Sequence, residues 1–271
     1  MAVAGYLAAK RPEPTVLPPA VGTGLVVRRH VLAMRNVWWI FATGFLEPLL
    51  YLLSIGIGVG ALVGGFEIGG KEVAYAAFVA PGMLAASAMN GAVMDSTMNV
   101  FHRLKYDKLY DQMLSTPLTA VQVAGGQIGF SLARGGLYSA AFLAIMGALG
   151  YVESWWGVLA LPATLLVGFA FAAVGMAVTT FMRSWQDLEL VQLVVMPMFM
   201  FSATFFPVDT FEGWLRVVVE CTPLYRGVVL CRELTTGVLT WDSAISVVYL
   251  AAMGLAGLWV CRRRLTTLLL S

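Results

Sequence analysis

The sequence is poor in charge. Only 12% of its 271 residues are Asp, Glu, Lys or Arg, whereas 59% are hydrophobic and the mean hydropathy is +0.82. Because a soluble domain carries about 25% charged residues, this chain cannot cover a soluble surface, and the composition indicates a membrane protein. The net charge of +2 is too small to favour binding to nucleic acid.

Metal-binding and redox residues are also scarce. The chain has three cysteines, Cys221, Cys231 and Cys261, with no CxxC or Cys/His spacing, and two isolated histidines, His30 and His102. We therefore predict no metal or redox site. Cys221 and Cys231 fall on the predicted outer side and could pair, although free packing thiols are the favoured interpretation.

Catalytic motifs are missing as well. Residues 65–72 nearly match a P-loop, but Glu72 stands where Ser or Thr would hold magnesium, and no strand is predicted before them. No GxSxG or HExxH motif is present. The sequence therefore predicts neither an enzyme nor a cofactor held by this chain.

What the sequence has is long apolar runs. Runs of about 20 apolar residues match the thickness of a bilayer core, and they predict an all-α membrane protein with six transmembrane helices. The spans are expected at about 38–62, 74–98, 124–149, 157–182, 188–206 and 242–261. Residues 1–21, rich in proline, are expected to form a disordered cytoplasmic tail, and residues 22–271 one transmembrane domain.

Before the first span, residues 22–37 predict an amphipathic helix. Arg28 and Arg29 fall on one face, and Val27, Val31 and Met34 on the other. Such a helix can lie in the inner interface of the membrane. The alternative is a first span that starts early with basic flanks.

Positive charge predicts the orientation of the chain in the membrane. Twelve Lys and Arg residues fall at one set of span ends, against four at the other, and the basic side is cytoplasmic by the positive-inside rule. Both termini are therefore expected in the cytoplasm. The twelve are Lys10, Arg11, Arg28, Arg29, Arg35, Arg103, Lys105, Lys108, Arg183, Arg262, Arg263 and Arg264.

The polar stretch Phe101–Pro117, FHRLKYDKLYDQMLSTP, interrupts the apolar runs on the predicted cytoplasmic side. Read as a helix it is amphipathic, and Pro117 would end it. A short amphipathic helix between two spans can lie on the bilayer surface or dock into a groove of a partner. The residues alone leave both open.

A second unusual stretch, Phe205–Thr240, lies on the predicted outer side. Two short helices, at about 209–221 and 224–235, are expected to hinge at Thr222–Pro223. Neither is long enough to span a bilayer, so together they fit a re-entrant hairpin covered by protein. An ordinary outer loop with surface helices is the alternative.

Two acidic residues lie at or near membrane depth. Glu47, followed by Pro48, is deep in the first span, and Asp95 is near the inner end of the second. Because a carboxylate in a membrane is costly and often functional, Glu47 suggests either a structural role or a proton-coupled secondary transporter. Asp95 is expected to pair with a nearby basic residue, and Arg134 to extend toward the inner interface.

Several of these stretches resemble the ABC-2 family of export permeases. The loop ending in LSTPLT and the segment FFPVDTFEGWLRVVVECTPLYRGVVLCREL stand where that family has its characteristic prolines. The stretches LEPLLYLLSIGIGVGALVG and YAAFVAPGMLAASAMNGA and the end RRRL look like the nodulation protein J type of lipo-oligosaccharide exporter. Daunorubicin-type drug permeases are also similar.

The resemblance implies a permease that carries no ATPase site itself. It would dimerise and recruit two copies of a separate ATPase subunit, which binds ATP and magnesium, in the inner membrane of a bacterium. Membrane lipid would surround it. It would move an amphipathic substrate out of the cytoplasm or inner leaflet: a lipid-linked oligosaccharide, a glycolipid or a hydrophobic drug.

The resemblance also implies roles for three sets of residues. The segment coupled to the ATPase would include Arg103, Leu104, Lys105, Lys108, Leu109, Tyr110, Met113 and Thr116. The candidate pathway, from spans one, two and five, would include Phe41, Phe45, Glu47, Met94, Met196, Met198 and Phe199. Ordinary lipid-facing or packing side chains are the alternative for the Met and Phe residues. The re-entrant gate at the outer end would include Asp209, Trp214, Pro223, Tyr225 and Arg232.

Overall fold

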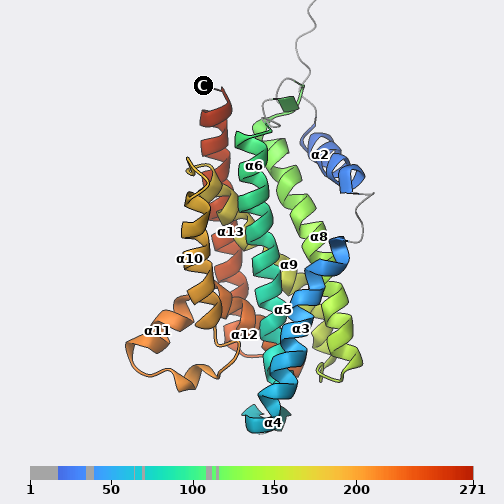
Figure 1. Ribbon diagram of the computed structural model, residues 1–271, viewed down its shortest axis with the longest axis vertical. Coiled ribbons are helices and arrows are strands. Elements are labelled where there is room, and N and C mark those ends of the chain that lie inside the picture. Colours follow the sequence, from blue (N-terminus) through green and yellow to red (C-terminus); the bar gives the residue numbers. More distant parts are fainter. Residues whose placement is uncertain are drawn as a thin grey trace, which may run out of the picture.

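The computed structural model describes residues 18–34, 40–63, 65–68, 71–107, 112–113 and 116–270. In this part of the chain the fold is a helical bundle with one small β-hairpin (Figure 1). The helices α2 to α6 are α2 (Pro19–Met34), α3 (Ile40–Gly58), α4 (Gly60–Val63), α5 (Tyr75–Met94), the π-helix η2 (Asp95–Asn99) and α6 (Val100–Lys105). After them come α8 (Ala120–Ala148), the 3-10 helix η3 (Trp155–Leu159), α9 (Ala160–Thr179), α10 (Asp187–Met200), η4 (Val208–Thr210), α11 (Trp214–Cys221), α12 (Pro223–Thr236) and α13 (Trp241–Leu270).

Four helical segments in the described residues are long and apolar enough to cross a membrane. They are Tyr75–Lys105, Val121–Ala148, Trp155–Thr179 and Trp241–Arg264. An all-helical membrane protein is therefore confirmed. The helices α3 and α10 lie at the other two predicted spans; α10 has only 14 residues, and the described stretch Pro48–Leu62, from α3 into α4, is a shorter apolar helix, so six crossings stay a prediction.

The centre of the bundle is α5, which continues through η2 into α6 as one rod. Most of α5 is buried, because α3, α8, α9 and α12 all pack against it. Outside this layer, α13 packs on α9 and α2 on α8. The rod thus contacts most other elements and runs nearly the length of the molecule (Figure 1).

The two ends of the bundle carry different elements. The C-terminal end of α13, α6 and α2 lie at one end, here called the α6 end (Figure 1). The helices α4, α11 and α12 lie at the opposite, α12 end. The segments predicted to face the cytoplasm therefore gather at one end, and those predicted to face outward gather at the other.

The prediction of a fifth span over residues 188–206 was wrong at its C-terminal end. The helix α10 stops at Met200 after 14 residues, or about 21 Å. Pro197 lies inside it, and Ala203 has a left-handed backbone with φ 55°. The Ser202 hydroxyl donates to the carbonyl of Phe199 at 2.8 Å and helps to satisfy the backbone where the helix ends.

The expected helix over Phe101–Pro117 is interrupted within the described residues. The first part, up to Lys105, is the end of the rod, and the chain then turns at Tyr106 and Asp107. The amide of Asp107 donates back to the His102 carbonyl at 3.2 Å, which closes the helix. Gln112 and Met113 are helical again, whereas residues 108–111, 114 and 115 lie outside the described part, so a helix over them stays a prediction. The helix α8 starts with a capping box between Thr119 and Gln122.

The segment that nearly matches a P-loop forms a hairpin instead of the expected loop. Strand β1 (Gly65–Ile68) pairs antiparallel with β2 (Lys71–Ala74), with Gly65 opposite Ala74. A P-loop joins a strand to a helix, so this geometry agrees with rejecting the motif.

The helix expected at 22–37 begins earlier and buries another face. It starts at Pro19, within the predicted tail, whose residues 1–17 lie outside the described part. Val26 and His30 are buried, whereas Val31 is exposed. The reason is close packing on α8, where a methyl group at Gly126 would lie 2.5 Å from Cβ of Val26.

Candidate functional site

A cavity of about 490 Å³ opens beside the central rod. Its walls come from α3, α5, α8 and α10, which are far apart in sequence. The lining residues are Pro48, Tyr51, Met83, Ala86, Ser87, Asn90, Gly91, Met94, Arg134, Tyr138, Gln192, Val195, Met196 and Phe199. The volume is within the range of small-molecule sites.

Three predicted pathway residues, Met94, Met196 and Phe199, line this cavity. Met198 packs against the hydrophobic core instead. The side chains of Phe41, Phe45 and Glu47 lie outside the described residues. Part of the apolar lining was therefore predicted from the sequence. The amides of Asn90 and Gln192, which also line the cavity, had no predicted role there.

A buried ion pair borders the cavity. The Arg134 guanidinium of α8 donates to the Asp95 carboxylate at the start of η2, and the two side chains are only 16% and 5% exposed. Asn99 donates a second hydrogen bond to Asp95 at 2.8 Å. The predicted pairing of Asp95 with a basic residue is confirmed. The position of Arg134 near the inner interface stays a prediction, and its guanidinium is held within the bundle by this pair.

The π-helix that carries Asp95 has its own supports from α9. A π turn frees backbone groups from the regular α-helical pattern and is frequent at functional sites. The Thr179 hydroxyl donates to the freed carbonyl of Ser96 at 2.9 Å. Gly175 allows this approach, since a methyl group there would lie 2.1 Å from the Ser96 hydroxyl oxygen.

At the α6 end, Arg103 joins three helices. Its Nη1 atom lies 2.6 Å from Nε2 of His30 on α2 and 2.7 Å from Oε1 of Gln127 on α8. Nδ1 of His30 lies 2.8 Å from the Val26 carbonyl, so Nδ1 donates and Nε2 accepts, as in a neutral imidazole. Burial, opposed by the hydrogen bond to Val26 and aided by the charge of Arg103, lowers the pKa of His30.

Four of the other predicted coupling residues lie in the described part of the chain. Leu104 packs against the core, Lys105 is exposed and Met113 is buried. The Thr116 hydroxyl caps the Met113 carbonyl in a turn. Lys108, Leu109 and Tyr110 lie outside the described residues.

An aromatic cluster, missed in the sequence, fastens the end of the rod to the loop before α10. The rings of Phe101 and Tyr106 lie 6.1 Å and 6.4 Å from that of Trp185, in edge-to-face geometry. Such pairs add to the stability gained by burial alone.

At the α12 end, two short helices lie at the positions of the predicted hairpin, called the hairpin below; its re-entry into the membrane stays a prediction. The helices α11 and α12 meet at Thr222, whose hydroxyl caps α12 by accepting from the Tyr225 amide at 3.4 Å, and Pro223 takes the first helical position. Asp209 precedes the hairpin in η4 and pairs with Arg216 at 3.0 Å. Trp214 is exposed and Tyr225 half-buried.

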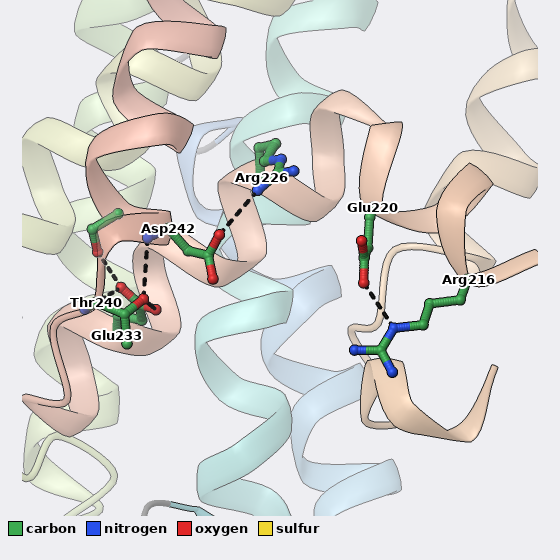
Figure 2. A network of polar contacts seen from close by, with 7 residues as sticks. Arg216, Glu220, Arg226, Glu233, Thr240 and Asp242 are labelled. Carbon is green, nitrogen blue, oxygen red and sulfur yellow. Dashed lines mark hydrogen bonds and ion pairs between the residues drawn. The ribbon is translucent and has the colours of Figure 1, made fainter. Parts of the chain in front are cut away.

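Polar contacts fix the hairpin to α13 (Figure 2). Arg226 lies 3.4 Å from Asp242, and Glu233 accepts from the hydroxyls of Thr240 and Ser243. Within the hairpin, Arg216 donates to Glu220 at 2.8 Å. Arg216 and Glu220 therefore pair within the hairpin, whereas Arg226 and Glu233 contact residues at the start of α13 and just before it.

Arg232 connects the hairpin to two further elements. Its guanidinium stacks on Phe78 of α5, and Nη2 donates to the Ala203 carbonyl at 2.8 Å, at the break after α10. Cys221, Cys231 and Cys261 are free thiols, so the possible disulfide between the first two is absent.

Comparison with known proteins identifies the family. The family model described as "ABC-2 type transporter" matches residues 22–234. The chain belongs to the ABC-2 type transporter family. Nodulation protein J of Rhizobium leguminosarum bv. trifolii is 34% identical over 215 residues, which cover 78% of this chain and 80% of that protein. Nodulation protein J of Neorhizobium galegae is 29% identical over 247 residues, 89% of this chain and 93% of that protein.

Family membership makes this chain a membrane component of a transporter and not the ATPase. Permeases of the ABC-2 family normally work with a separate ABC ATPase subunit. The resemblance read from the sequence is therefore confirmed for the family and for the nodulation protein J likeness.

Proposed function

We propose that this chain is the permease subunit of an ATP-driven exporter in a bacterial inner membrane. Two copies would assemble with two ATPase subunits and move an amphipathic substrate outward, such as a lipid-linked oligosaccharide, a glycolipid or a hydrophobic drug. The observation that carries the proposal is the cavity beside α5, because Met94, Met196 and Phe199 offer adaptable apolar surface next to amides and hydroxyls.

The contacts of Arg103 support a route for the mechanical signal. ATP binding would close the ATPase dimer and draw the two segments 103–116 together. Arg103 links the rod to α2 and α8, so these helices would move as one body. The same rod borders the cavity and reaches Phe78 under Arg232, so the motion would arrive at both the cavity and the hairpin.

The test is to purify the chain together with a candidate ABC ATPase subunit from the same organism and to measure ATP hydrolysis with and without candidate substrates. We expect a stable complex whose substrate-stimulated activity falls in Leu109→Ala and in Tyr110→Ala, while the basal activity and the yield of folded complex stay unchanged. Normal stimulation in both variants would contradict the coupling role of this segment.

A rival mechanism, a proton-coupled carrier that uses Glu47, predicts different results. It requires transport by the chain alone in vesicles under a proton gradient, and loss of the pH dependence in Glu47→Gln. Transport that needs the ATPase and ATP, and that survives Glu47→Gln, would favour the exporter.

A further inference from the structure

Arg134 takes part in both the cavity and the buried ion pair. It is part of the cavity wall, and it is also the partner of Asp95. Of the described residues that line the cavity, Arg134 is the charged one, whereas Asp95 lies behind it and does not line the space. A ligand in the cavity therefore meets the cation of this pair and not the carboxylate.

The chemistry around Arg134 is rich in hydrogen-bond donors. A guanidinium has five N–H groups in a planar fork, and the contact with Asp95 uses the Nη2 atom. The amides of Asn90 and Gln192 and the hydroxyl of Ser87 line the same cavity. Donors of this kind suit phosphate, sulfate or carboxylate oxygens, which arginine binds in bidentate geometry.

The rest of the cavity suits an apolar chain. Met83, Met94, Met196 and Phe199 line it, and these side chains are flexible or aromatic and adapt to many apolar shapes. The cavity thus combines a cation with flexible apolar side chains, and this combination suits a molecule that carries an acidic group on a hydrophobic tail.

We infer that the cavity binds an amphipathic anion whose acidic head group shares the Arg134 guanidinium with Asp95. This inference rests on the proposed function and narrows its substrate class. Because a charged group inside a membrane protein is costly unless it is paired, Asp95 keeps Arg134 neutralised while the cavity is empty. An arriving anion competes with Asp95 for the same N–H donors.

The competition also gives the bound ligand a way to influence the rod. Asp95 is the first residue of η2, and its carboxylate accepts from Asn99 at the other end of the same π turn. When an anion draws Arg134 away, the π turn loses its ion pair with α8. The ligand would therefore loosen the middle of the rod that ends at Arg103.

The test measures binding to the permease alone, in phosphatidylcholine nanodiscs, by competition against radiolabelled dodecyl phosphate. The competitors share one tail and differ in head group: dodecyl phosphate, dodecyl glucoside and dodecyltrimethylammonium, with inorganic phosphate as the free anion. We expect the wild type to prefer dodecyl phosphate by about tenfold or more over the neutral and cationic analogues. Inorganic phosphate should compete poorly.

Substitutions at the pair are expected to act in opposite directions. Arg134→Gln should weaken dodecyl phosphate binding about ten- to hundredfold, whereas Asp95→Asn should strengthen it, since the competing carboxylate is removed. Arg134→Gln leaves Asp95 without its cation and could fail to fold for that reason. In that case the double variant Asp95→Asn with Arg134→Gln, which buries no unpaired charge, is measured in place of the single variant. Arg183→Gln, which removes an exposed cation elsewhere, is the matched control and should bind as the wild type does.

Equal binding of the three analogues, an anion preference that survives loss of Arg134, or full competition by inorganic phosphate would each overturn the inference. Since no ATPase subunit takes part in this assay, its failure would leave the exporter proposal standing. Conversely, a chain that binds the anion but forms no complex with the ATPase would refute only the exporter proposal.

Discussion

The Cζ atom of Arg232 lies 3.9 Å from the centroid of the Phe78 ring, so a cation from the hairpin stacks directly on the central helix. The same guanidinium donates to the carbonyl of Ala203, where the chain leaves α10. One side chain thus holds together α12, α5 and the break in α10.

Replacing Arg232 with lysine should weaken this junction while keeping the charge. Lysine lacks the planar group that stacks on Phe78 and donates to Ala203 together, so we expect a loss of about 1–3 kcal/mol in the free energy of unfolding. Unfolding in detergent micelles measures it. Arg226→Lys is the control on the same helix, because its exposed pair with Asp242 should contribute about 1 kcal/mol or less. Equal losses in both variants would contradict the special role of Arg232.

The contact between α9 and the π turn gives a second prediction. Gly175→Ala should destabilise the protein by about 1–3 kcal/mol, because the new methyl group meets the Ser96 hydroxyl oxygen. Adding Ser96→Ala should restore much of the loss, and this coupling can be measured by a double-mutant cycle. Gly135→Ala on α8 has open space around the new methyl group and should not destabilise. Additive losses in the cycle would show that the hydroxyl is not the obstacle.

Acid should loosen α2. The pKa of His30 is lowered by burial in the docked state relative to about 6.5 in an exposed histidine. The undocked form therefore binds more protons as the pH falls below about 6.5, and docking weakens progressively from there. Arg103 and Arg29 face the ring and oppose its protonation further.

A spin-label distance between α2 and α8, followed from pH 8 to pH 5, measures this loosening. His30→Gln should remove the pH dependence in this window, whereas His102→Gln should leave it, since His102 is exposed and pairs with Asp107 of its own segment. A profile that is unchanged in His30→Gln would assign the effect to another group.

Filling the cavity should block the response to substrate without harming the fold. Gly91 lines the cavity, and a side chain there would enter open space, so Gly91→Leu should keep or slightly raise stability, by up to about 1 kcal/mol from helix propensity. Substrate-stimulated ATPase activity of the complex should fall about tenfold, a loss equivalent to about 1.4 kcal/mol. Gly24→Leu, also into open space but on α2, is the control for added bulk, and equal inhibition by both would argue against a role for the cavity.

Local features of the sequence predicted much of the fold. The apolar runs located the long helices, and the pair Thr222–Pro223 located the hinge of the hairpin, because a capping hydroxyl followed by proline favours the start of a helix. The end of α10 was missed, since the run from 188 to 206 is mostly apolar and its length alone suggested a span. Pro197, Ser202 and Thr204 were the available signals of a break.

The candidate site was harder to predict, because it depends on pairs that are distant in sequence. Asp95 and Arg134 are 39 residues apart, and His30 and Arg103 are 73 apart. Periodicity describes which face of a helix is apolar, but it does not say which other helix covers that face. Met94 and Phe199 were predicted as pathway residues from their residue type, whereas Asn90 and Gln192 meet in the cavity only through the packing of α5 and α10, which the sequence does not reveal.

The π turn also fixes the direction in which the side chains of α6 point around the axis of the rod. Each residue of an α-helix turns the chain by about 100°, so a single residue removed from Asp95–Asn99 would swing α6 by that angle about its axis. Arg103 would then point away from both His30 and Gln127. Insertions and deletions in this short stretch should therefore be tolerated far less than substitutions, since they would disconnect the two ends of the molecule while leaving every helix intact.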